Sequence, residues 1–152
     1  MKHITIRPYQ TTDWTSLSAI HDSARRIELH YAGLDEAFLP LDIAAPAEGL
    51  FDYTVVVAVL EGEVCGFAAY QDRELAWLYI DPAYMRKGIG RALIQYVMEQ
   101  VKQRPICIEV LEGNLPAISF YESMGFSTVT CCSGKMPGNE KFSVTVRCMQ
   151  KN

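Results

Sequence analysis

The sequence has no excess of basic residues: 14 lysines and arginines stand against 18 aspartates and glutamates, for a net charge of −4. Proteins that bind duplex DNA or RNA normally carry a basic stripe, so we expect no nucleic acid partner. A small anionic ligand is compatible with this balance, because a few local cations and backbone N–H groups suffice to hold one.

Long apolar runs are also missing. The longest strongly apolar run covers residues 55–60, and it is far too short to cross a bilayer. The first nine residues, MKHITIRPY, lack the apolar core of a signal peptide. We therefore expect an intracellular, cytoplasmic protein with no membrane partner.

The cysteines and histidines lack the spacing of a metal site. The five cysteines form no CxxC pair and two of them are adjacent, which suits neither a disulfide framework nor a zinc site. The three histidines have no partners at ligand spacing, so the sequence predicts no metal. We expect reduced thiols, mostly on strands, as in a cytosolic protein. These residues are Cys65, Cys107, Cys131, Cys132 and Cys148, with His3, His21 and His30.

The remaining composition is typical of a globular protein, with 49% hydrophobic and 21% charged residues. A chain of 152 residues is the size of one domain, which we place at 1–152. The order of the predicted elements indicates an α/β domain with a mixed sheet. Strands are expected at 3–7, 54–60, 64–70, 74–80, 106–111, 126–132 and 142–149. Helices are expected at 12–27 and 88–103, in a weaker piece at 34–50 broken at Pro40 and Pro46, and at 115–124.

The segment 75–103 is the most informative, because a strand leads through a basic turn into a helix that starts at Gly88-Ile89-Gly90. The free N–H groups of a first helical turn favour an anion, and glycine lets a phosphate approach them. The segment lacks the GxxxxGK[ST] of a P-loop, and Leu93 stands where a dinucleotide fingerprint needs its third glycine. A helix start with solvated basic residues is the plain alternative.

Two stretches carry a family resemblance. IDPAYMRKGIGRAL at 80–93 resembles the acetyl-CoA-binding signature of the GNAT superfamily of N-acetyltransferases, although Met85 stands where the family has Gln or Arg. NLPAISFYESMGF at 114–126 is similar to the other signature of that family. The resemblance implies a mixed, mostly antiparallel sheet of six or seven strands flanked by about four helices. It also implies transfer of an acetyl group from acetyl-CoA, as co-substrate, to a primary amine by direct attack in a ternary complex.

The resemblance assigns cofactor contacts to positions that match the family motifs. Backbone groups of Leu78, Tyr79 and Ile80 would pair with the pantetheine, with Tyr79 open to a substrate-side role or to packing. Asn114 would bind the cofactor, cap the following helix, or both. The phosphate loop would comprise Met85, Arg86, Lys87, Gly88, Ile89, Gly90 and Arg91.

The same resemblance assigns two catalytic residues. Tyr121 matches the tyrosine taken as general acid for the departing thiolate, and it would also lie near the cofactor; Phe120 is the better candidate for the core. Glu109 is the predicted base, since it stands alone in an apolar strand, twelve residues before Tyr121. That spacing is similar to the one in ribosomal-protein-alanine N-acetyltransferases, where the glutamate acts through water. A solvent-facing glutamate, or one paired with an arginine, is the alternative.

The acidic charge is concentrated in one segment. Residues 22–52 hold seven acids against Arg25 and Arg26, and the family's acceptor side is formed by residues corresponding to 8–53. The acids could line an entrance for a cationic amine or merely solvate a helix face. The expected partner is a small amine or a peptide amine, with the protein a monomer or homodimer. Alternatives are a non-catalytic acyl-CoA-binding or regulatory module and an N-terminal peptide acetyltransferase.

Overall fold

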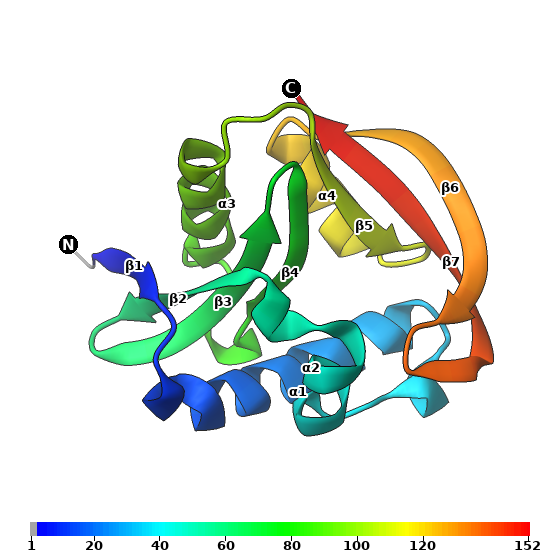
Figure 1. Ribbon diagram of the computed structural model, residues 1–152, viewed down its shortest axis with the longest axis horizontal. Helices are drawn as coiled ribbons and strands as arrows, with labels where there is room; N and C mark the ends of the chain where they lie inside the picture. Colours follow the sequence, from blue (N-terminus) through cyan, green and yellow to red (C-terminus); the bar gives the residue numbers. More distant parts are fainter. Residues whose placement is uncertain (1–2) are drawn as a thin grey trace.

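A computed structural model describes residues 3–152 of the chain. In this part of the chain seven strands form one sheet in the order β1-β2-β3-β4-β5-β7-β6, antiparallel throughout except between β4 and β5 (Figure 1). The strands are β1 (Ile4–Pro8), β2 (Thr54–Leu60), β3 (Glu63–Gln71), β4 (Glu74–Ile80), β5 (Ile106–Leu111), β6 (Ser127–Met136) and β7 (Asn139–Lys151). The helices are α1 (Trp14–Tyr31), α2 (Leu41–Glu48), α3 (Ile89–Gln100) and α4 (Leu115–Ser123), with short 3-10 turns η1 (Thr11–Asp13), η2 (Asp35–Ala37), η3 (Leu50–Asp52) and η4 (Pro82–Tyr84).

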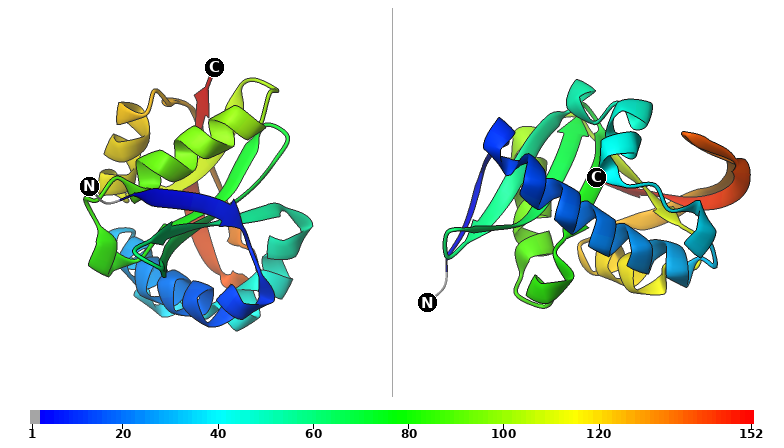
Figure 2. Two further views of the ribbon diagram at one scale, coloured as in Figure 1. Left: turned by 90° about the vertical axis from the view of Figure 1, so that its left-hand side faces the viewer. Right: turned by 90° about the horizontal axis from the view of Figure 1, so that it is seen from below.

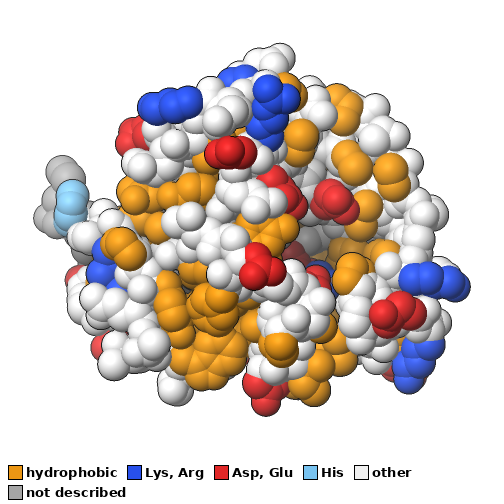
Figure 3. Space-filling model, in the orientation of Figure 1, with side chains coloured by type: hydrophobic (Ala, Val, Ile, Leu, Met, Phe, Trp, Pro, Cys, Tyr) orange, Lys and Arg blue, Asp and Glu red, His pale blue; other side chains and the backbone are white. Residues whose placement is uncertain are grey.

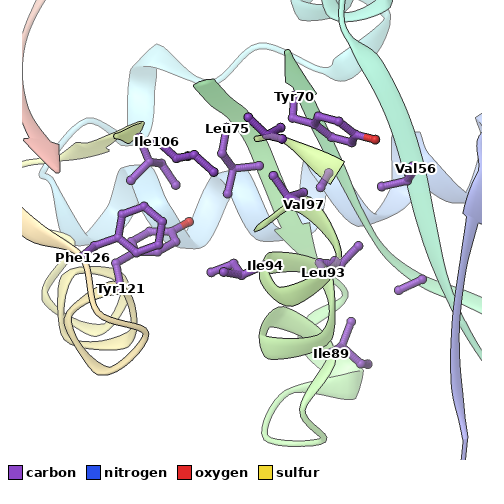
Figure 4. Packing of buried hydrophobic residues seen from close by; sticks show 14 of the residues in the cluster. Val56, Tyr70, Leu75, Ile89, Leu93, Ile94, Val97, Ile106, Tyr121 and Phe126 are labelled. Carbon is purple, nitrogen blue, oxygen red and sulfur yellow. The ribbon is translucent and has the colours of Figure 1, made fainter. Parts of the chain in front are cut away.

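The helices cover the two faces of the sheet. On one face α3 and α4 pack on the strands, and the α3 residues Ile89, Leu93 and Val97 recur at the spacing of a single helical stripe (Figure 4). On the other face lie α1 and α2 (Figure 2). They contribute Leu17, Ile20 and Leu41 to a second core. The apolar run of β2 is buried on both faces because it lies between these two layers.

β4 and β5 diverge. They are joined at the pair Glu74–Cys107, where the Cys107 N–H also donates to the Arg73 carbonyl at 2.8 Å. A bulge at Ala76, between Leu75 and Trp77, bends β4 just beyond this pair. From there to Ile80 the edge of β4 that faces β5 has no strand beside it. The sheet is therefore open in its middle.

A long hairpin of β6 and β7 closes one side of this opening. Met136, at the end of β6, packs with Leu29, Ala37 and Leu111 in a third cluster. The Asn139 side chain donates a hydrogen bond to the Ala37 carbonyl at 3.0 Å. The hairpin is thus fastened to the end of α1 and to η2.

The expected mixed α/β fold is confirmed, with four differences. Pro46 does not break the second helix but lies inside α2, where burial of Leu41, Ala44 and Ala45 outweighs one missing N–H donor. The last two strands are longer than expected, because Pro137-Gly138 makes a tight turn with Gly138 at φ +74°. α3 ends at Gln100 rather than 103, since Val101 is extended.

The fourth difference concerns the face that α1 buries. Ile27, which the apolar spacing places on the core side, is 46% exposed, while Leu29 is buried. In residues 3–152 we find no helix long and apolar enough to span a membrane.

Candidate active site

A cavity of about 590 Å³ occupies the opening between β4 and β5. It crosses the plane of the sheet, because Ile108, Ala117 and Tyr121 line it from the side of α3 and α4, whereas residues of α1 and α2 line it from the other side. The space-filling view, in the orientation of Figure 1, shows a hollow near the middle of the molecule with acidic side chains around it (Figure 3). The α1 and α2 residues are His21, Arg25, Glu28, Ala44 and Glu48.

The predicted phosphate loop lies between β4 and α3. The Asp81 carboxylate accepts a hydrogen bond from the Ala83 N–H at 2.9 Å, which fixes the turn η4. Arg86 and Gly88 both have positive φ, +63° and +82°, so the chain turns sharply before α3 begins at Ile89. Met85, Arg86 and Lys87 are exposed beside the first turn of α3. This places exposed cations and the free N–H groups of a helix start together, as an anion requires.

Gly90 has a packing role that the sequence did not reveal. A Cβ at this position would lie 3.0 Å from Cζ of Phe120 on α4. Glycine therefore lets α3 and α4 approach closely at this point.

The three β4 residues predicted to hold the pantetheine lie on the open edge of the strand. Leu78 and Ile80 point toward the α3 and α4 core, and Tyr79 points toward α1. Their backbone pairs with β3 on one side only. The other side is free to bind an extended ligand in the manner of a strand.

Tyr121 lies on α4 and reaches the cavity from within the core. Its ring packs against Phe126, with 5.8 Å between centroids, and the two lie side by side in Figure 4. Tyr121 is 7% exposed whereas Phe120 is only partly buried, so the expectation that Phe120 is the core aromatic was wrong. Burial raises the pKa of Tyr121 well above its usual value, and the nearby charge of Glu28 raises it further. The phenol is thus held protonated.

Glu109 lies on β5 with its exposed side chain lining the cavity, opposite Cys148 of β7. Its neighbours Ile108 and Val110 are buried on the opposite face. The arginine of β7, Arg147, pairs with Glu112 at 2.6 Å. Glu109 therefore lines the cavity from the face of β5 that is turned away from the α3 and α4 core.

Asn114 is 4% exposed, and its side-chain oxygen accepts a hydrogen bond from the Ala117 N–H at 3.4 Å. The predicted helix cap is confirmed.

The sequence reasoning missed a group of charged residues on α1 and Tyr79 as their partner. Arg25 and Glu28 form an ion pair at 3.1 Å that faces the cavity, and Tyr79 interacts with Glu28. Burial raises the pKa of Glu28, while Arg25 and Tyr79 oppose this shift. The signal was present: Arg25 and Glu28 continue the helical face of Leu17 and His21, where apolar residues are expected.

The acidic segment contributes some residues to the cavity and others to the fold. Glu28 and Glu48 line the cavity, where Glu74 and Glu109 join them from the strands. Asp22 is structural, because it accepts hydrogen bonds from the Leu41 N–H at 2.9 Å and from His21 at 3.0 Å. Four carboxylates against Arg25 give the cavity a negative balance.

An opened mixed sheet with a cavity in the opening and a helix start beside exposed cations suits a ligand that carries an anionic group. Residues 51–128 match the family model described as the acetyltransferase (GNAT) domain, and the chain belongs to this family. The resemblance seen in the sequence is thereby confirmed.

Relatives and solved structures agree. The peptidyl-lysine N-acetyltransferase YiaC of Escherichia coli K12 is 40% identical over 72 residues, 47% of this chain and 48% of that protein. The ribosomal protein bS18 alanine N-acetyltransferase of the same organism is 34% identical over 76 residues, 45% and 51% of the two chains. The chain thus spans about half the length of these relatives.

Two solved structures share the fold. A GCN5-related N-acetyltransferase from Rhodopseudomonas palustris superposes with a TM-score of 0.80 at 19% identity, covering 97% of this chain and 94% of that one. A phosphinothricin acetyltransferase from Sinorhizobium meliloti, in complex with acetyl-CoA, superposes with a TM-score of 0.68 at 18% identity, covering 97% and 87%.

Proposed function

We propose that the chain is an acetyl-CoA-dependent N-acetyltransferase that transfers the acetyl group to a small primary amine by direct attack in a ternary complex. The supporting observation is the cavity that crosses the sheet between β4 and β5. It has a buried phenol on one wall and carboxylates on the other, so two reactants can meet in it from opposite faces.

Acetyl-CoA fits the surroundings of this cavity. The pyrophosphate would bind the first turn of α3, with N–H groups from Gly88 to Arg91 and the side chains of Arg86 and Lys87 nearby. Met85 would contribute its backbone. The pantetheine would lie along the free edge of Leu78–Tyr79–Ile80 and near Asn114. These contacts put the thioester beside Tyr121.

The chemistry divides between two residues. Glu109, through an intervening water, takes a proton from the acceptor ammonium, and the amine lone pair attacks the thioester carbonyl carbon. As the C–N bond forms and the C–S bond breaks, Tyr121 gives its proton to the departing thiolate. The nitrogen then loses a second proton, which restores the phenol. Overall one proton is released for each amide formed.

The acceptor is expected to be cationic. The cavity holds Glu28, Glu48, Glu74 and Glu109 against the single guanidinium of Arg25 among the described lining residues. A negative balance of this kind favours an ammonium over a neutral or anionic acceptor. The names of relatives that act on lysine or alanine amines are compatible with such a preference.

A panel of amines tests the proposal. Purified protein should release CoA from acetyl-CoA with at least one primary amine, and the product should be the amide. Initial rates should show that both substrates bind before any product leaves. Glu109→Gln should lower kcat steeply near neutral pH and remove the acid limb of the pH–rate profile, and an unchanged profile would remove Glu109 as the base.

Two other outcomes would redirect the assignment. Tight binding of acetyl-CoA without CoA release for any amine would identify a non-catalytic acyl-CoA-binding module. Faster reaction with peptide N-termini than with free amines would identify an N-terminal peptide acetyltransferase, which the Glu109–Tyr121 spacing favours as the second candidate.

A further inference from the structure

We infer that Glu28 binds the ammonium group of the acceptor, with Arg25 and Tyr79 as its positioning residues, and that this site selects an unbranched primary alkylammonium. The inference rests on the proposed acetyl transfer and names the substrate class of the same cavity. It gives Glu28 a role separate from that of Glu109.

Two neighbours hold the Glu28 carboxylate in place, and some of its hydrogen-bond acceptor positions stay open. Nη1 of Arg25 lies 3.1 Å from Oε1 of Glu28, and the Tyr79 side chain interacts with the same carboxylate. A carboxylate has about four lone-pair sites, so acceptor positions remain for an ammonium. The Glu28 side chain is 27% exposed, and this exposure is toward the cavity that it lines.

Glu28 and the proposed acid share the cavity. Glu28 lines it from α1 and Tyr121 from α4, and the charge of Glu28 adds to the effect of burial in raising the pKa of the Tyr121 phenol. An ammonium held by Glu28 would therefore lie in the same cavity as Tyr121, where the thioester is expected. Glu109 lines the cavity from another element, β5, and keeps its separate role as the proposed base.

The walls around Glu28 suit an alkyl chain. The ring of Tyr79 packs against His21, with 4.9 Å between centroids, and against Trp77 at 6.2 Å. His21 is almost fully buried, and burial lowers its pKa, so at neutral pH it adds no positive charge. Leu39 and Ala44 line the same space. Neutral aromatic and aliphatic walls below a carboxylate favour a methylene stem that ends in an ammonium.

A methylene stem that ends in an ammonium group is found in a free diamine and in a lysine side chain. The probe for the first is putrescine, and the probe for the second is a lysine peptide blocked at its N-terminus. A peptide with a free alanine N-terminus tests a branched amine. The two alkylammonium probes should react faster than the alanyl peptide, and their ratio identifies the source.

The decisive variant is Glu28→Gln, compared with Glu36→Gln, an exposed carboxylate of the same acidic segment. With putrescine, Glu28→Gln should raise the KM for the amine about 10- to 100-fold, the equivalent of a lost hydrogen bond to a charged group. The KM for acetyl-CoA and the acid limb of the profile should not change. Glu28→Asp, which keeps the charge, should recover part of the amine KM and covers the case in which the amide variant does not fold.

A second variant tests the positioning by Arg25. Arg25 opposes the burial that raises the pKa of Glu28, so Arg25→Gln should raise that pKa further. The amine KM of this variant should be highest at acidic pH and should fall as the pH rises, which a purely structural defect would not do.

Two results would overturn the inference. The first is an amine KM in Glu28→Gln equal to that in Glu36→Gln; the second is loss of the acid limb in Glu28→Gln, which would make Glu28 the base. Failure of the wild-type protein to release CoA with every amine would instead overturn the proposed function.

Discussion

At the scale of single residues, Tyr121 has a packing role in the core and a proposed role as the general acid. Its ring belongs to the core with Phe126, and its hydroxyl is the part available to the cavity. Sequence motifs identified the residue but treated burial and function as alternatives. Burial raises the pKa of the phenol and keeps it protonated, as the proposed general acid requires.

Tyr121→Phe separates the two roles. The ring and its contact with Phe126 are retained, so we expect the free energy of unfolding to change little. General acid catalysis typically contributes about 10²- to 10⁴-fold, and kcat should fall by an amount in that range. The measurement is kcat beside a urea unfolding curve. A variant with wild-type kcat would show that Tyr121 is a core residue only.

Asp13 gives a prediction for acid stability. Its carboxylate accepts two hydrogen bonds from Arg7, at 2.8 and 2.9 Å, and these lower its pKa below the usual 3.8. A carboxyl group with a lowered pKa in the folded state stabilises the protein above its ordinary pKa, and this is lost as the pH falls through the folded value. Asp13→Asn should cost about 1–3 kcal/mol at neutral pH.

The same variant should lose less stability than the wild type on acidification below about pH 4. Urea unfolding at several pH values measures both effects. Asp42→Asn, at an exposed carboxylate on α2, is the control and should leave both unchanged. Parallel acid curves for Asp13→Asn and the wild type would contradict this account.

At the scale of elements, the spacing of apolar residues predicted those strands and helices that bury one regular apolar face. The β2–β3 hairpin and the start of α3 follow from alternation, turn residues and a glycine pair. The α2 helix was misjudged because Pro46 signals a break locally, and only the tertiary burial of Leu41 and Ala44 shows why the helix survives.

Of the residues predicted for the candidate site, Glu109 and Tyr121 line the cavity, the loop at 85–91 precedes α3, and Asn114 caps α4. The sequence could not locate the Arg25–Glu28 pair. Helical spacing shows that both residues share the inner face of α1. That this face borders a cavity follows only from the divergence of β4 and β5, which is a tertiary feature.

Gly90 carries a prediction at this scale. Gly90→Ala would place a Cβ 3.0 Å from the Phe120 ring, so α3 and α4 must separate or Phe120 must turn. We expect a loss of about 1–3 kcal/mol in the free energy of unfolding, the usual cost of overpacking. Acetyl-CoA binding should weaken as well, because the phosphate loop moves with α3.

The second-site change Phe120→Leu should restore most of the stability of Gly90→Ala. Chemical unfolding and acetyl-CoA titration of the single and double variants measure this. Equal losses in Gly90→Ala and in the double variant would place the clash elsewhere.

At the scale of the whole molecule, the charge is divided between two regions. Four carboxylates line the cavity, and Arg86 and Lys87 lie just before the start of α3. Added salt screens both attractions, so the KM for a cationic amine and that for acetyl-CoA should both rise with ionic strength. An uncharged acceptor should show no such increase, and steady-state rates from low to high salt test this.

The divergence of β4 and β5 also leaves amide protons of the inner strand edges without a partner inside the sheet. A pantetheine lying against β4 would act as the missing strand between the two halves of the molecule. Deuterium exchange followed by mass spectrometry should therefore find the peptide that covers Leu78–Tyr79–Ile80 labelled quickly in the free protein and slowly with CoA present. The bound co-substrate would then fill the gap in the sheet beside the site where it reacts.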